Sequence, residues 1–120
     1  MQRFQQMVTS ELTGEVTVLS PVDEDRLDDY SVTFSYAPTA PQFVIPDFFT
    51  DYLNGLSDQK VTVEELASKI LDDLCPQVPA LRWGVVVEGE VAGVQVKAVV
   101  ERRTVTDLTV ATQVVPPTNK

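Results

Sequence analysis

Histidine is absent from this 120-residue chain, and Cys75 is its single cysteine. A zinc site of the usual kind draws four ligands from cysteine and histidine, so one copy of the chain cannot build it. Catalysis by a histidine acid–base group or by a Ser-His-Asp triad is excluded for the same reason. A lone cysteine also rules out an internal disulfide framework, which is typical of proteins in a reducing compartment.

Basic residues are scarce as well, with 9 Lys and Arg against 18 Asp and Glu and a net charge of -9. Such a surface repels phosphate backbones and anionic lipid, so we expect neither nucleic acid nor a membrane as a partner. No apolar run approaches the roughly 18 residues that a spanning helix needs. The first seven residues are largely polar, unlike a secretion leader. We therefore expect a cytoplasmic protein.

The amino-terminal half predicts two strands separated by an acidic turn. Residues 15–19 are mostly β-branched or aliphatic, and residues 20–29 carry five acidic side chains. The next segment alternates with a period of two, which predicts a strand that is apolar on one face and hydroxylated on the other. Its apolar members are Tyr30, Val32, Phe34 and Tyr36, and the hydroxylated ones are Ser31, Thr33 and Ser35.

Two helices follow in the middle of the chain. Pro46 suits the first position of a helix, and Gly55 suits its end. Thr62 and Glu65 have the spacing of a capping box, which predicts the start of a second helix. Leu66, Ile70 and Leu74 mark the buried stripe of that helix, and Pro76 stops it.

Residues 81–88 and 94–103 predict two long strands joined by a turn at 89–93, and residues 108–114 could add one more strand. The order is therefore ββααββ, an α+β fold in which two helices cover one face of a four-stranded antiparallel sheet. We divide the chain into an amino-terminal segment 1–12, a domain 13–103 and a carboxyl-terminal extension 104–120. Unpaired sheet edges predict a homo-oligomer.

This order resembles the tunnelling fold of GTP cyclohydrolase I, dihydroneopterin aldolase and 7-cyano-7-deazaguanine reductase. The strongest likeness is to the last family, the nitrile reductases of queuosine biosynthesis. Residues 30–38, Tyr-Ser-Val-Thr-Phe-Ser-Tyr-Ala-Pro, are similar to a Phe-Ala-Thr-Ile-Tyr-Ile-x-Tyr-x-Pro strand of that family. Residues 43–74 follow the family pattern without a gap, including Ile-Leu-Asp-Asp-Leu at 70–74.

The resemblance also places the catalytic positions, and most of them have changed. Ser20 stands where the family has its nucleophilic cysteine, and Asp28 stands near the family's aspartate. An unassisted serine hydroxyl is not ionised at neutral pH, and no histidine is present to activate it. The residues taken by themselves suggest a simpler interpretation, in which Ser20 is a turn residue before Pro21 and Asp28 is a solvated loop charge.

The resemblance places Glu64 at the family's purine- or pterin-anchoring glutamate, while Val63 replaces the adjacent histidine. By its position alone, Glu64 is better explained as an acid in the first turn of a helix, where the dipole favours it, and the resemblance brings the two interpretations nearly level. The segment that the family uses for the nicotinamide cofactor is Ile-Pro-Asp-Phe-Phe-Thr at 45–50, and a later Pro-Arg-Gly turn is reduced to residues 92–93. The basic groups that would hold NADPH are missing, so we expect no cofactor and no metal.

The leading hypothesis is a divergent, metal-free relative of the nitrile reductase that binds a purine- or pterin-like ligand between its own subunits. One alternative is a structural or assembly subunit without a site, for example a virus-encoded one. Another is a lyase similar to dihydroneopterin aldolase, although neither Lys60 nor Lys97 clearly matches its lysine. We expect Cys75 to pack near the end of the second helix as a small apolar group. Trp83 is expected in the core or at an interface, and stacking on a flat heterocycle is its less favoured alternative.

Overall fold

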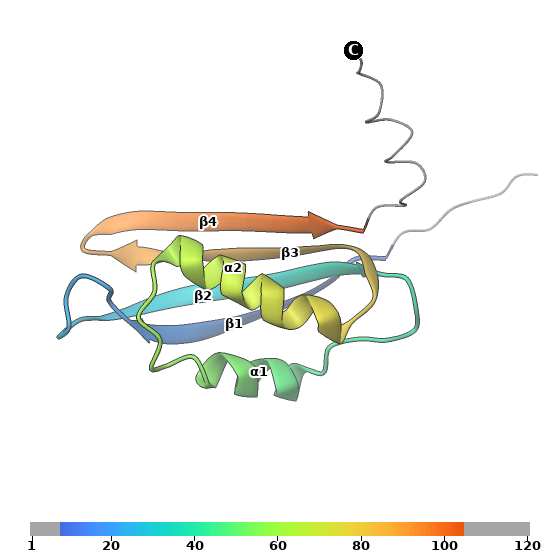
Figure 1. Ribbon diagram of the computed structural model, residues 1–120, viewed down its shortest axis with the longest axis horizontal. Coiled ribbons are helices and arrows are strands. Elements are labelled where there is room, and N and C mark those ends of the chain that lie inside the picture. The colour runs from blue at the N-terminus through green and yellow to red at the C-terminus, as the bar shows by residue number, and fades with distance from the viewer. Residues whose placement is uncertain (1–7, 105–120) are drawn as a thin grey trace, which may run out of the picture.

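The computed structural model describes residues 8–104, and these form the predicted ββααββ order (Figure 1). The strands are β1 (Ser10–Leu19), β2 (Leu27–Pro38), β3 (Ala80–Val91) and β4 (Val94–Arg103). The helices are α1 (Pro46–Asn54) and α2 (Val63–Leu74), and a short 3-10 turn (Cys75–Gln77) follows α2. The further strand predicted at 108–114 lies outside the described residues.

The four strands form one antiparallel sheet in the order β1-β2-β3-β4. Strand β1 begins at Ser10, five residues before the predicted start, because its pairing with β2 continues to Tyr36. The β3–β4 turn is also tighter than predicted. Only Ala92 (φ 53°) and Gly93 (φ 80°) lie outside the strands, and positive φ at both positions is typical of a two-residue hairpin turn.

Gly89 explains why the predicted turn at 89–93 was too long. This residue is paired with Tyr30 inside the sheet, where a Cβ atom would lie 2.5 Å from the carbonyl oxygen of Asp29. The glycine is therefore required by the close approach of β2 and not by a turn.

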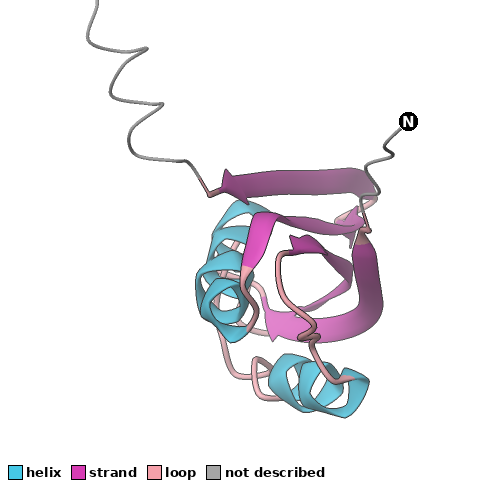
Figure 2. Ribbon diagram, turned by 90° about the vertical axis from the view of Figure 1, so that its right-hand side faces the viewer, coloured by secondary structure: helices cyan, strands magenta, loops and turns pink. Residues whose placement is uncertain are grey.

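The apolar face of the sheet is the core face. The alternating residues Val32, Phe34 and Tyr36 of β2 are at most 1% exposed. Helix α2 packs over β3 and β4 with Leu66 and Ile70 fully buried, and helix α1 packs against β1 (Figures 1 and 2). Both helices thus cover the same face, as the sequence predicts.

The opposite face of the sheet carries no helix from the described part of the chain. It presents the hydroxylated residues of β2, and Thr33 is hydrogen-bonded across to Thr13 of β1 through their hydroxyl oxygens at 3.1 Å. Within residues 8–104, β1 and β4 lie at the two edges of the sheet, and Leu19 at the end of β1 makes one isolated bridge to Lys60. Within residues 8–104, no helix is long and apolar enough to span a membrane.

Candidate functional site

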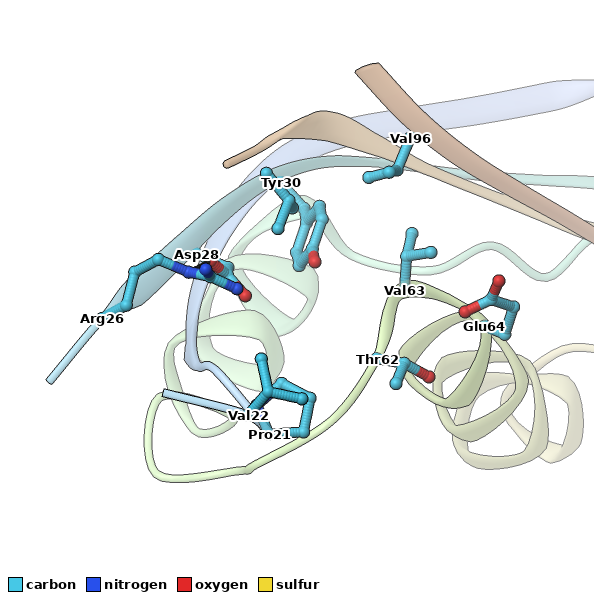
Figure 3. Close-up of a pocket in the computed structure, with 10 residues that line it drawn as sticks. Pro21, Val22, Arg26, Asp28, Tyr30, Thr62, Val63, Glu64 and Val96 are labelled. Atoms are coloured by element: carbon cyan, nitrogen blue, oxygen red, sulfur yellow. Dashed lines mark hydrogen bonds and ion pairs between the residues drawn. The ribbon is translucent and has the colours of Figure 1, made fainter. Parts of the chain in front are cut away.

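One end of the molecule contains a cavity of about 250 Å³. Three segments that are distant in the sequence meet there, namely the 20–26 turn, the beginning of α2 and the β3–β4 hairpin (Figure 1). Four valines contribute apolar surface to its walls: Val22, Val63, Val91 and Val96. Its polar groups are Arg26, Asp28, Tyr30, Thr62 and Glu64 (Figure 3).

Ser20 organises the turn that borders this cavity. Its Oγ accepts hydrogen bonds from the amides of Val22 (3.2 Å) and Asp23 (3.1 Å) and from Nη2 of Arg26 (3.0 Å). Its own amide donates to the carbonyl oxygen of Arg26 at 3.0 Å. The side chain is 1% exposed and does not line the cavity. This geometry therefore supports the interpretation of Ser20 as a turn residue.

Asp28 is buried, so its interpretation as a solvated loop charge is wrong. Strand β2 begins at Leu27, and the period-two alternation places Asp28 on the core face together with Tyr30. The carboxylate is 3% exposed, and its Oδ1 accepts a hydrogen bond from Nε of Arg26 at 2.9 Å. A buried carboxylate needs such a cation, because desolvation without a partner is costly. Arg26 is thus held at the cavity by Asp28 and Ser20 together.

Tyr30 is the site residue that the sequence did not identify. Its side chain is 4% exposed, and its hydroxyl points into the space between the Arg26–Asp28 pair and helix α2 (Figure 3). Burial raises the pKa of Tyr30, and the negative charges of Asp28 and Glu64 raise it further, against a lowering effect of Arg26. The hydroxyl is therefore protonated at neutral pH and is able to donate a hydrogen bond.

The predicted capping box fixes the beginning of α2. The Thr62 hydroxyl oxygen accepts from the amide of Glu65 at 3.2 Å, and Oε1 of Glu65 accepts from the amide of Thr62 at 2.9 Å. Glu64 takes no part in this cap, and its carboxylate is exposed at the cavity wall next to the buried Val63 (Figure 3). Glu64 and Asp28, which the resemblance implied, therefore line the same cavity.

Several other residues that the sequence analysis considered lie away from the cavity. The indole nitrogen of Trp83 donates to the carbonyl oxygen of Val78 at 2.9 Å, and Cys75 is buried at the end of α2. Lys60 lies 3.7 Å from a carboxylate oxygen of Glu24, and neither Lys60 nor Lys97 lines the cavity.

Residues 45–50 lie at the other end of the molecule, at the beginning of α1 (Figure 1). They border a second hollow of about 210 Å³, where Phe43, Ile45 and Phe48 are exposed. Across the described residues, no group of three His, Cys, Asp or Glu side chains is placed to hold a metal ion.

No protein-family model matches the chain, and no curated protein matches it either. Among solved structures, the chain is similar to an archaeosine synthase QueF-Like protein in its apo form, with a TM-score of 0.74 and 21% sequence identity. The match covers 82% of this chain and 96% of that one. The likeness confirms the predicted tunnelling fold.

Proposed function

We propose that this protein binds a purine- or pterin-like heterocycle at Glu64 and does not reduce a nitrile. The observation that carries the proposal is the cavity itself. It joins the exposed Glu64 carboxylate, which the family resemblance aligns with a purine or pterin anchor, to apolar walls made by Val63 and Val96. The similar fold of an archaeosine synthase supports the same class of ligand.

The chemistry of the cavity suits such a ligand. A carboxylate can accept two parallel hydrogen bonds, and a ring N–H next to an exocyclic amine offers two donors at the matching spacing. Valine side chains suit the apolar faces of a flat ring, and small-molecule sites are commonly apolar with a few placed polar groups. Arg26 lines the same cavity and, because it is always charged, attracts an electron-rich edge of the ligand.

A panel of guanine, 7-deazaguanine and pterin in thermal-shift assays tests the proposal. A compound that binds only the folded state raises the melting temperature, by an amount that grows with its concentration relative to Kd. We expect at least one compound of the panel to do so. If all of them leave the melting temperature unchanged, the proposal fails and a structural subunit becomes the better explanation.

Nitrile reduction is expected to be absent. Ser20 is buried and its oxygen already accepts three hydrogen bonds, while apolar Val63 replaces the family's histidine. We therefore expect no oxidation of NADPH when the protein is mixed with 7-cyano-7-deazaguanine, as followed by absorbance. Ser20→Cys should not create activity either, because a thiol at this position still points into the turn. Turnover above a no-enzyme control, in either protein, would contradict this assignment.

Assembly is the second part of the proposal. Within the described part of the chain, β1 and β4 are the edges of the sheet, and exposed sheet edges pair readily with other chains. A closed ring of subunits satisfies both edges at once. Light scattering should therefore report a closed homo-oligomer of defined mass. A monodisperse monomer at micromolar concentration would contradict this prediction.

A further inference from the structure

We propose that Tyr30 contacts the ligand directly, with its hydroxyl donating a hydrogen bond to a ring nitrogen or carbonyl oxygen of the heterocycle. This inference rests on the proposed function and adds a requirement to it. The ligand must present an acceptor to Tyr30 as well as donors to Glu64. Tyr30 is thereby a specificity-determining residue of the cavity.

The first argument is the unsatisfied hydroxyl. Tyr30 is 4% exposed, yet its hydroxyl makes no hydrogen bond to any residue between 8 and 104. The other two tyrosines have protein partners. The hydroxyl oxygen of Tyr36 accepts from the amide of Val44 at 3.0 Å, and the O–H group of Tyr52 donates to Oδ2 of Asp73. Buried polar groups are nearly always paired with protein or with water, so a hydroxyl that faces a cavity without a protein partner is available to a molecule bound there.

The second argument is the surroundings of the hydroxyl. Oδ1 of Asp28 accepts from Arg26, and Glu64 stands on the far side of Val63 from the Tyr30 hydroxyl (Figure 3). The raised pKa of Tyr30 keeps the proton on the phenol and so makes it a donor. Val63 and Val96 flank the space in front of it, so a ring placed there would contact apolar side chains beside the hydroxyl.

The ligand class follows from these two contacts. Glu64 accepts hydrogen bonds, so it selects the donor edge of a heterocycle. Tyr30 donates, so it selects an acceptor on the part of the ring that lies toward β2. Lactam heterocycles with an amino group, such as pterin and 7-deazaguanine, carry both kinds of edge. Hydrocarbon rings of the same size carry neither and should be rejected.

Removing only the hydroxyl tests the inference. We expect Tyr30→Phe to weaken the binding of pterin or 7-deazaguanine by about two- to tenfold in calorimetric titration, the usual effect of one neutral hydrogen bond. Without ligand, its melting temperature should equal or exceed that of wild type, because no protein partner is lost. Tyr52→Phe is the matched control. It should keep the affinity and lower the melting temperature, because its hydroxyl is bonded to Asp73.

The outcomes separate this inference from the proposed function. Equal affinities of wild type and Tyr30→Phe, with Glu64→Gln still weakened, would overturn the role of Tyr30 and leave the ligand class standing. If ligand-free Tyr30→Phe melts at a temperature as low as that of Tyr52→Phe, the Tyr30 hydroxyl has a protein partner. That result would also overturn the proposed role of Tyr30. If neither compound binds wild type, the proposed function fails and this inference fails with it.

Discussion

Phe34→Ala is expected to lower the free energy of unfolding by about 3–5 kcal/mol, the usual cost of emptying a fully buried aromatic site. Phe34 is 0% exposed at the centre of the sheet, opposite Leu12 of β1 and Val85 of β3. Its ring centroid lies 5.4 Å from that of Tyr36. Domains are stable by only about 5–15 kcal/mol, so this single change removes a large share of the total. Urea unfolding at one fixed protein concentration measures the loss.

Phe43→Ala is the matched control for this prediction. It deletes the same atoms from a side chain that is 69% exposed in the loop before α1, so the expected change is within about 0.5 kcal/mol. Similar losses in the two variants would show that the core is not where the burial pattern places it. A loss below 1 kcal/mol for Phe34→Ala would mean that the neighbouring side chains collapse into the space left by the ring.

The fold was predictable because its signals are local. The alternation of residues 30–36 sets the core face of β2, and the capping box at Thr62 sets the first residue of α2. Both signals depend on neighbours within a few positions, which a sequence displays directly. The end of the β3–β4 hairpin was harder to predict. Gly89 looked like a turn residue, whereas it is needed because β2 approaches closely, and that contact is not visible in the sequence.

The candidate site was predictable in part. The resemblance identified Asp28 and Glu64, and the structure brings both to one cavity. The burial of Asp28 was missed because its acidic neighbours suggested a solvated loop, while the alternation that buries it extends backward from Tyr30. One signal in the sequence could have revealed it. Asp28 and Tyr30 have a spacing of two, which places an anion and a phenol on one face of β2, and the cation Arg26 lies just before that strand.

Tyr30 was missed for a related reason. An aromatic residue in an alternating strand is nearly always core, and most of its ring is indeed buried. Only the position of its hydroxyl at a cavity distinguishes it from Tyr36, whose hydroxyl is bonded to the backbone of Val44. That distinction depends on how the 20–26 turn, α2 and the hairpin meet, which no local pattern encodes.

Glu64→Gln is expected to weaken the binding of the best compound from the panel by about tenfold to a hundredfold. The carboxylate accepts hydrogen bonds from two ligand donors, and hydrogen bonds to a charged group contribute about 1.5–3 kcal/mol. At about 1.4 kcal/mol per decade, that range gives the expected loss in affinity. Glutamine keeps the shape of the side chain, but its amide nitrogen is a donor that faces the donors of the ligand.

Glu65→Gln separates this effect from the loss of a negative charge near the helix N-terminus. It makes the same charge change one residue further along α2, where the side chain is bonded to the amide of Thr62 and not directed to the cavity. A glutamine can still complete a capping box, so the stability of both variants should stay close to wild type. Calorimetric titration should then show weakened binding for Glu64→Gln alone. Equal affinities of Glu64→Gln and wild type would remove Glu64 as the anchor. If Glu64→Gln and Glu65→Gln lose the same affinity, the effect comes from the electrostatic field of the helix N-terminus and not from a direct contact with Glu64.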